Sequence, residues 1–445
     1  MEILLYTIVF LLLLVVSNVT NRFLPQLPLP LVQIVLGISL GFILPQEKFH
    51  LDTELFLALV IGPLLFREAE ESNITSILKH WRIVLYLIFP VIFISTVGLG
   101  YLAHLLWGAL PLAACVAVGA ALGPTDLVAF ASLSERFSFP KRVENILKGE
   151  GLLNDASGLV AFRVALLAWI TGSFSLGKAS ISLVLSIIGG FAAGMASAAL
   201  NRWLHKLLMS AQVSDIASEL LLELSLPLVT FFLAEEIHVS GIIAVVVAGI
   251  FKASRFKRIT LLEAQVDSVT ETIWNTVNFM LNGSVFIILG MELEMISEPI
   301  LKSPIYDNLL LLVSIVLLTF LLFALRFVML FTFYFIRIRR LHKNVGNYLK
   351  EMLLLTFSGV KGTVSIATIL LIPSQLEQDH PLLLFLVAGV TFLSFLTGLL
   401  TLPHLSEEKE EEAEHLMHIA ILNEVVSELE SGLKQAKVKA PLYAA

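Results

Sequence analysis

The chain has 445 residues and a formal net charge of −7; 57% of its residues are hydrophobic, only 15% are charged, and its mean hydropathy is +0.89. Soluble domains carry about 25% charged residues, so this composition excludes a water-soluble enzyme; together with the negative charge it also excludes a disordered chain and a nucleic-acid-binding protein. The single Cys115 excludes an intramolecular disulfide. The sequence therefore predicts an all-α polytopic membrane protein.

Long apolar runs recur along the chain, and a helix needs about 20 mostly apolar residues to cross a bilayer. The first run follows no basic segment and precedes no small-residue cleavage site, so we expect a retained helix and not a signal peptide. We predict about thirteen transmembrane helices, at about 2–20, 29–45, 53–66, 83–106, 110–133, 150–171, 179–200, 216–234, 240–251, 272–291, 309–336, 350–372 and 381–402.

The Lys and Arg residues between these runs are distributed unevenly. With the N-terminus outside, 19 of them fall in internal loops, and 3 fall in external loops, namely Lys48, Lys178 and Lys302. Positive charge concentrates on the cytoplasmic side of membrane proteins. We therefore expect a multi-pass protein of the cell membrane (inner or plasma membrane), with its N-terminus outside and its C-terminus in the cytoplasm.

Two of the predicted helices are interrupted near their middle. The interruptions combine residues that weaken a helix with residues that carry charge: Gly123, Pro124, Thr125 and Asp126 in the fifth run, and Gly359, Lys361 and Gly362 in the twelfth. Free backbone groups at membrane depth survive only where they are buried in protein or line a cavity. The two runs cross in opposite directions, as expected if helices 1–6 and 8–13 are inverted repeats. Paired interruptions of this kind indicate the binding site of a transporter.

The sixth run begins with two carboxylates and an amide, Glu150, Asn154 and Asp155. Glu150 and Asp155 are five residues apart and point about 140° apart on a helix, so they need different partners. One carboxylate can bind a cation while a basic residue pairs with the other. Hard cations such as Na+ prefer oxygen ligands, which these side chains supply. The sequence predicts a cation site in this region.

Four segments, in this order, resemble signatures of one family: residues 123–126 (GPTD), 148–160 (KGEGLLNDASGLV), 238–249 (HVSGIIAVVVAG) and 359–367 (GVKGTVSIA). They are similar to the Na+/H+ exchanger/NhaP branch of the monovalent cation:proton antiporters. The resemblance implies the antiporter fold, with two inverted six-helix repeats and crossed broken helices. It also implies a secondary active antiporter that exchanges a monovalent cation, Na+ or Li+, for H+, with no cofactor and no enzymatic activity.

The resemblance also implies how the membrane domain, residues 1–403, is divided. Helices 1–3 and 7–10 (about 1–66 and 179–291) would form the interface of a homodimer, and helices 4–6 and 11–13 (about 80–172 and 309–402) the ion-transporting core. Residues 404–445 are predicted to form an acidic cytoplasmic tail, with nine Glu against four Lys. Apolar residues at helical spacing predict an amphipathic helix within it: Leu422, Val425, Val426, Leu429 and Leu433.

In the family that the sequence resembles, the Asp of the Asn-Asp pair carries the cation or the proton, and here this residue is Asp155. Thr125 and Asp126 would assist coordination where the broken helices cross, which implies a Na+ site at Asp155, Asp126 and Thr125. Asn154 is typical of the electroneutral members and implies exchange of one cation for one proton. Because a carboxylate holds a cation or a proton but not both, alternating exposure of Asp155 to the two sides would exchange them.

Three positions depart from the family pattern. Gly151 stands where Ser is usual, so a backbone oxygen or a water would have to replace a hydroxyl ligand. Lys361 stands where Arg is usual, and we predict that it forms a structural ion pair with Glu150. In the third helix a basic residue replaces an acid, which leaves the adjacent Glu68 as a candidate accessory residue; Arg163, inside the sixth helix, is another.

Four other functions would use similar residues. A K+/H+ antiporter would use the same ligands. A cation channel or a non-transporting membrane sensor would also use them, but a channel carries net current. An intramembrane aspartyl protease would use two aspartates, here Asp126 and Asp155, but the sequence has neither the GxGD pattern nor the downstream PAL of such enzymes.

Overall fold

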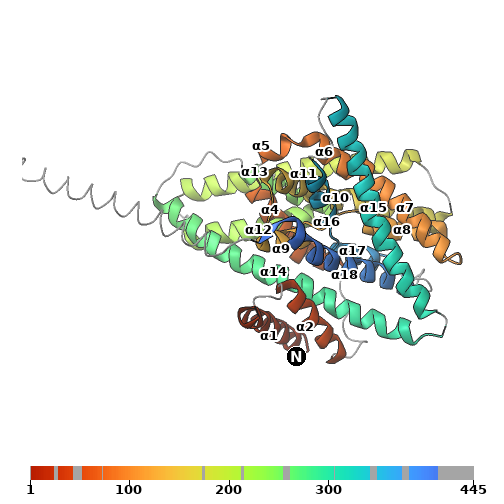
Figure 1. Cartoon of the computed structure of the whole chain (residues 1–445). Helices are drawn as coiled ribbons and strands as arrows, with labels where there is room; N and C mark the ends of the chain where they lie inside the picture. Colours follow the sequence, from red (N-terminus) through yellow and green to blue (C-terminus); the bar gives the residue numbers. More distant parts are fainter. Residues whose placement is uncertain are drawn as a thin grey trace, which may run out of the picture.

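The computed structural model describes residues 2–24, 29–43, 53–72, 74–172, 176–211, 215–253, 261–304, 306–340, 348–372 and 380–408. Within these ranges the chain is almost entirely helical, and every run that the sequence predicts as a transmembrane helix coincides with a helical segment (Figure 1). Eight of the described helices are long and apolar enough to cross a membrane, and shorter apolar helices lie at Ile8–Phe23, Leu29–Ile43 and Gly241–Ala253. The all-α fold class is therefore confirmed, while the number of crossings and the inverted repeats stay predictions.

The first half of the chain runs from α1 to α10. Its elements are α1 (Glu2–Phe23), α2 (Leu29–Ile43), α3 (Thr53–Phe56), the π-helical turn η1 (Leu57–Ile61), α4 (Gly62–Glu71), α5 (Ile74–Leu78), α6 (Trp81–Tyr86), the π-helical turn η2 (Leu87–Val91), α7 (Ile92–Leu106), α8 (Leu112–Leu122), α9 (Leu127–Arg136), β1 (Phe137–Ser138) and α10 (Lys141–Thr171).

The rest of the chain forms mostly longer helices and includes α16 and α17, the two halves of an interrupted helix. Its elements are α11 (Leu176–Ser210), α12 (Ile216–Glu236), α13 (Gly241–Ala253), α14 (Leu261–Lys302), α15 (Asn308–Arg340), α16 (Leu349–Phe357), α17 (Thr363–Leu370), α18 (His380–Leu405) and β2 (Glu407–Glu408).

Three helices are clearly longer than the sequence pattern predicts, namely α10, α11 and α14. α10 begins at Lys141, directly after Pro140, so the Gly149–Gly151 segment lies inside a continuous helix and not at its start. α14 has 42 residues and extends well beyond the predicted run 272–291. Charged residues interrupt the apolar run at these places, but Lys, Arg and Glu are good helix formers and do not end a helix.

The first two helices pack closely against α14 at one side of the molecule (Figure 1). Gly37 of α2 and Gly290 of α14 make this approach possible. A Cβ atom on either glycine would lie 2.1 Å from a backbone oxygen of the other helix. Any larger residue at these positions would push the two helices apart.

α10 contacts many of the other helices. It packs against α6, α7, α8 and α9 and also against α4, α11 and α13. Glu150 and Asn154 of α10 are buried, with 1% and 0% of their surfaces exposed.

A short strand pair, which the sequence did not predict, closes the described structure. β1 and β2 pair antiparallel, with Phe137 opposite Glu408 and Ser138 opposite Glu407. The predicted amphipathic helix around Leu422–Leu433 lies outside the described residues.

Candidate functional site

The two interrupted helices meet at their interruptions. The fifth predicted run is helical as α8 and α9, with Gly123–Asp126 non-helical between them, and the twelfth is helical as α16 and α17, with an irregular segment through Gly362. The backbone N–H of Asp126 donates a hydrogen bond to the carbonyl of Val360 at 3.0 Å. The structure therefore brings together two segments that are more than 200 residues apart in the sequence.

Asp126 lies where two helices begin. Its Oδ1 accepts a hydrogen bond from the N–H of Ala129 at 3.0 Å and so caps α9. Its Oδ2 faces Gly362, the residue that precedes α17, so closely that a Cβ there would lie 1.9 Å from this oxygen. A helix N-terminus carries partial positive charge, so the buried carboxylate is stabilised by both half-helices.

Lys361 provides the opposite charge at the end of a helix. Its Nζ donates hydrogen bonds to the carbonyl oxygens of Gly123 and Pro124, at 2.9 and 2.5 Å, just after the last residue of α8. The side chain is buried, with 2% of its surface exposed. A cation at a helix C-terminus satisfies free carbonyls and offsets the negative end of the helix dipole.

The structure corrects the predicted partner of Glu150. Both carboxylate oxygens accept hydrogen bonds from Arg326 of α15, at 2.6 and 2.7 Å, whereas the Nζ of Lys361 binds the carbonyls just described. Nε of Arg326 also donates to the carbonyl of Leu355 at 2.9 Å. A guanidinium can make all three bonds at once because its donors form a planar fork, which an ammonium lacks.

Thr125 connects this ion pair to Asn154. Its hydroxyl donates to Oε1 of Glu150 at 3.1 Å, and Nδ2 of Asn154 donates to both the carbonyl and the hydroxyl oxygen of Thr125, at 2.7 and 2.6 Å. These contacts fix the orientation of the amide, since only its nitrogen can donate. Oδ1 of Asn154 is buried and has no hydrogen-bond partner among the described residues.

Gly151 and Asp155 lie one helical turn apart on α10, on either side of this amide. A Cβ on Gly151 would lie 2.9 Å from Cβ of Leu127, the first residue of α9. Position 151 is thus a contact between α10 and α9 in this protein. The side chain of Asp155 lies outside the described residues; its backbone belongs to α10, next to Asn154.

A small cavity of about 10 Å³ lies beside the interruption, room for about one water-sized particle. Of the predicted site residues it contacts Asp126 and Pro124. Its lining comes from α8, α10 and α17 together with the interruption: Ala120, Ala121, Pro124, Asp126, Gly158, Leu159, Val364, Ser365 and Thr368.

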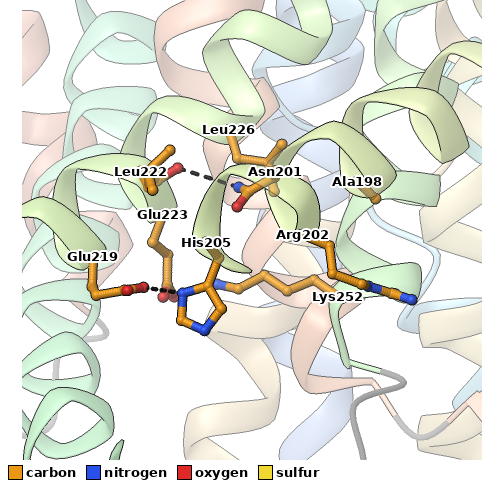
Figure 2. A pocket seen from close by; sticks show the side chains of 9 residues that line it. All are labelled: Ala198, Asn201, Arg202, His205, Glu219, Leu222, Glu223, Leu226 and Lys252. Carbon is orange, nitrogen blue, oxygen red and sulfur yellow. Dashed lines mark hydrogen bonds and ion pairs between the residues drawn. The ribbon is translucent and has the colours of Figure 1, made fainter. Parts of the chain in front are cut away.

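A larger cavity of about 40 Å³ lies elsewhere, between α11, α12 and α13 (Figure 2). Its charged groups bind one another: His205 contacts Glu219, and Lys252 bridges Glu223 and Glu70 at 2.5 and 3.1 Å. No group of His, Cys, Asp and Glu residues able to hold a metal ion occurs in the part of the chain that the structure describes. We therefore interpret the charged side chains around this cavity as an ion-pair network that joins helices.

The two candidate accessory residues lie away from the cluster. Glu68 pairs with Lys148 at 3.4 Å, and Lys148 precedes Asp155 by seven residues, about 10 Å along α10. Arg163 is half-exposed and lies 3.6 Å from Glu235 of α12. Among the described residues, neither side chain forms a hydrogen bond or an ion pair with Glu150, Thr125 or Asn154.

Sequence reasoning missed two features of the buried charge distribution. Arg326 lies inside a predicted transmembrane run, but no spacing rule connects it to Glu150, which lies 176 residues away. Glu292 and Glu294 of α14 are buried, with 7% and 6% of their surfaces exposed. The predicted tenth run ends at residue 291, just before these acids, because a carboxylate interrupts an apolar run.

Comparison with known families gives a match over most of the chain. The family described as "Sodium/hydrogen exchanger, transmembrane" matches residues 8–407. The solved structure of the sodium proton antiporter MjNhaP1 from Methanocaldococcus jannaschii is similar, with a TM-score of 0.65 at 18% identity, over 91% of this chain and 97% of that one. This similarity supports the observed fold.

Curated relatives are more similar in sequence. The "Sodium, potassium, lithium and rubidium/H(+) antiporter" of Bacillus pumilus (strain SAFR-032) and that of Bacillus subtilis (strain 168) are 36% and 37% identical over 93% and 92% of this chain. This chain spans 62% of the length of each. The "Uncharacterized Na(+)/H(+) exchanger YjcE" of Escherichia coli (strain K12) is 33% identical over 92% of this chain and 77% of its own length.

Proposed function

This chain belongs to the sodium/hydrogen exchanger family, and from that premise we propose that it is a secondary active antiporter that exchanges monovalent cations for protons. The observation that carries the proposal is the buried Oδ1 of Asn154. It is an oxygen without a hydrogen-bond partner among the described residues, next to Asp155 and beside two crossed half-helices. A buried carbonyl-type oxygen of this kind is a ligand for a hard cation.

The transported ion binds at Asp155 in this proposal. The Glu150 carboxylate is occupied by Arg326, so it does not compete for the cation. Asp126 offsets the positive ends of α9 and α17, and Thr125 orients Asn154. Cation and proton compete for one carboxylate, and movement of this carboxylate between the two sides exchanges one cation for one proton.

We propose that Na+ and Li+ are substrates and that K+ is one as well. The two Bacillus relatives carry sodium, potassium, lithium and rubidium in their names. Gly151 adds no side-chain oxygen, because the position faces Leu127. Selectivity depends on the number and rigidity of the ligands, and a site completed by water discriminates weakly between ions of different radius.

The remaining expectations follow from the family resemblance and the charge distribution. We propose that the protein is a homodimer in the cell membrane, with α10 and the broken helices in a mobile core, and that its C-terminus is cytoplasmic. The structure supports the core assignment through the contacts that join α8, α10, α17 and α18. We expect no enzymatic activity and no cofactor.

Everted membrane vesicles that contain the protein test this function. After a pH gradient is formed, addition of Na+, Li+ or K+ should dissipate it, as followed by the fluorescence of a pH-sensitive dye. Asp155→Asn should abolish the response, while Asp215→Asn should retain it, because Asp215 caps α12 at the surface and Asn is an equally good cap. Proton movement that persists in Asp155→Asn, or a net cation current without proton counterflow, would refute the proposal.

A further inference from the structure

The described structure ends with the chain paired to the connection between α9 and α10. β2 pairs with β1, with Glu408 opposite Phe137 and Glu407 opposite Ser138. β1 connects α9, which Asp126 caps, to α10. The C-terminal tail therefore begins on the connection between two helices that carry site residues.

This pairing is too short to hold the tail by itself. Isolated two-stranded pairs are marginally stable at best, and here each strand has two residues. The residues from 407 to 414, the acidic segment, include six Glu and one Lys, a net charge of −5. The acidic segment begins at β2, and β2 pairs with β1. A basic surface near β1 would therefore be in a position to bind this segment.

Such a surface is present where α10 begins. Arg142, four residues after Ser138, forms an ion pair with Glu351 of α16 at 3.1 Å. Its guanidinium also lies 5.9 Å from the ring centres of Tyr334 and Tyr348. Arg142 thereby ties α10 to the end of α15 and to the start of α16, the first half of the second broken helix.

Further basic residues surround Arg142. His80, between α5 and α6, has a pKa below its usual value, because of burial and then because of Arg142, with Arg337 and Lys79 acting in the same direction and Glu351 against them. Arg142, Arg337 and Lys79 therefore all lie close to His80. The basic face is defined as Lys79 and Arg337 together with the exposed basic residues that neighbour His80, Arg142 and Glu351 in the sequence, namely Arg82, Lys141 and Lys350.

We propose that the acidic segment docks on the basic face of its own chain. The six residues after Glu408 reach at most about 20 Å when extended. Arg142, which contacts α15 and α16, follows by four residues Ser138, the β1 residue that pairs with Glu407. The opposite charges of segment and face favour this contact over a free tail. The docked tail would join the α9–α10 connection to the start of α16, and so would hold both broken helices at the same end of the molecule.

A zero-length carbodiimide crosslink between carboxylates and amines tests the docking in the full-length protein, reconstituted in lipid nanodiscs. Peptides from the acidic segment should be joined to Lys141, Lys79 or Lys350. Lys206, an exposed lysine of α11 on the same predicted side of the membrane, serves as the matched control and should remain unlinked. The yield should fall severalfold when salt rises from about 0.1 M to about 1 M, because the Debye length shrinks from about 10 Å to about 3 Å.

The variant Lys79→Glu/Arg337→Glu separates docking from accidental proximity. Both residues are exposed, so the fold should be retained, which a thermal unfolding curve checks. Crosslinking of the acidic segment to Lys141 should fall severalfold, whereas Lys206→Glu should leave it unchanged. Equal crosslinking to Lys206, no effect of the double reversal, or crosslinks only between isotopically distinct chains would overturn the proposal. None of these outcomes depends on transport activity.

Discussion

Arg326 holds both carboxylate oxygens of Glu150, at 2.6 and 2.7 Å, with 3% and 1% of the two residues exposed. This pair joins α15 to α10 and occupies one of the two carboxylates that the sequence places near the site. Breaking a buried pair leaves an uncompensated charge and costs about 3–5 kcal/mol, whereas replacing both partners by neutral groups of similar volume is often tolerated.

Arg326→Met should therefore lower the thermal unfolding temperature of the purified protein strongly, and Glu150→Gln/Arg326→Met should recover much of the loss. Arg163→Ala is the matched control, because its pair with Glu235 is half-exposed and such pairs contribute about 0–1 kcal/mol. If Arg326→Met unfolds at the same temperature as Arg163→Ala, or if the double variant is the least stable of the three, the Glu150–Arg326 pair does not stabilise the fold in this way.

Thr125 should act on the cation through Asn154. Thr125→Val removes the hydroxyl that binds both Glu150 and Asn154, so the amide loses one of its two acceptors. We expect the apparent KM for Na+ to rise about tenfold, equivalent to about 1.4 kcal/mol. Thr125→Ser keeps the hydroxyl and should remain near wild type in vesicle exchange assays. Equal effects of Val and Ser would indicate that the methyl group matters and the hydroxyl does not.

Gly362 should tolerate no side chain. A Cβ at this position would lie 1.9 Å from Oδ2 of Asp126, so Gly362→Ala must separate α17 from the carboxylate that it faces. We expect lost exchange activity and a lower unfolding temperature. Gly108→Ala is the control, because the nearest atom to its added Cβ is 3.9 Å away. Wild-type behaviour of Gly362→Ala would contradict the observed contact.

Gly151→Ser tests whether the departure from the family pattern leaves a ligand position open. The new Cβ would lie 2.9 Å from Leu127, with the backbone of Leu127 at 3.3 Å, so the variant should be less stable and should not bind Na+ more tightly. Adding Leu127→Ala should relieve the crowding. Tighter Na+ binding by Gly151→Ser without loss of stability would show that the side chain reaches the cation.

Local sequence signals predicted the helices and the two interruptions, because apolar runs and Gly-Pro breaks are properties of neighbouring residues. They also indicated Asp126 as a residue at the crossing. The partner of Glu150 was predicted wrongly, because Arg326 and Lys361 are both buried cations and only the fold decides which one reaches the carboxylate. The β1–β2 pairing was also missed, because strands of two residues are too short to show a periodic pattern in the sequence.

The proposed exchange depends on competition of cation and proton for one carboxylate, Asp155. Isothermal titration calorimetry of the purified protein, repeated in buffers of different ionisation enthalpy, counts the protons released when Na+ binds. One proton should be released per bound Na+, at a pH where the empty site is protonated, and Asp155→Asn should bind no Na+. Na+ binding without proton release, or undiminished binding by Asp155→Asn, would contradict it.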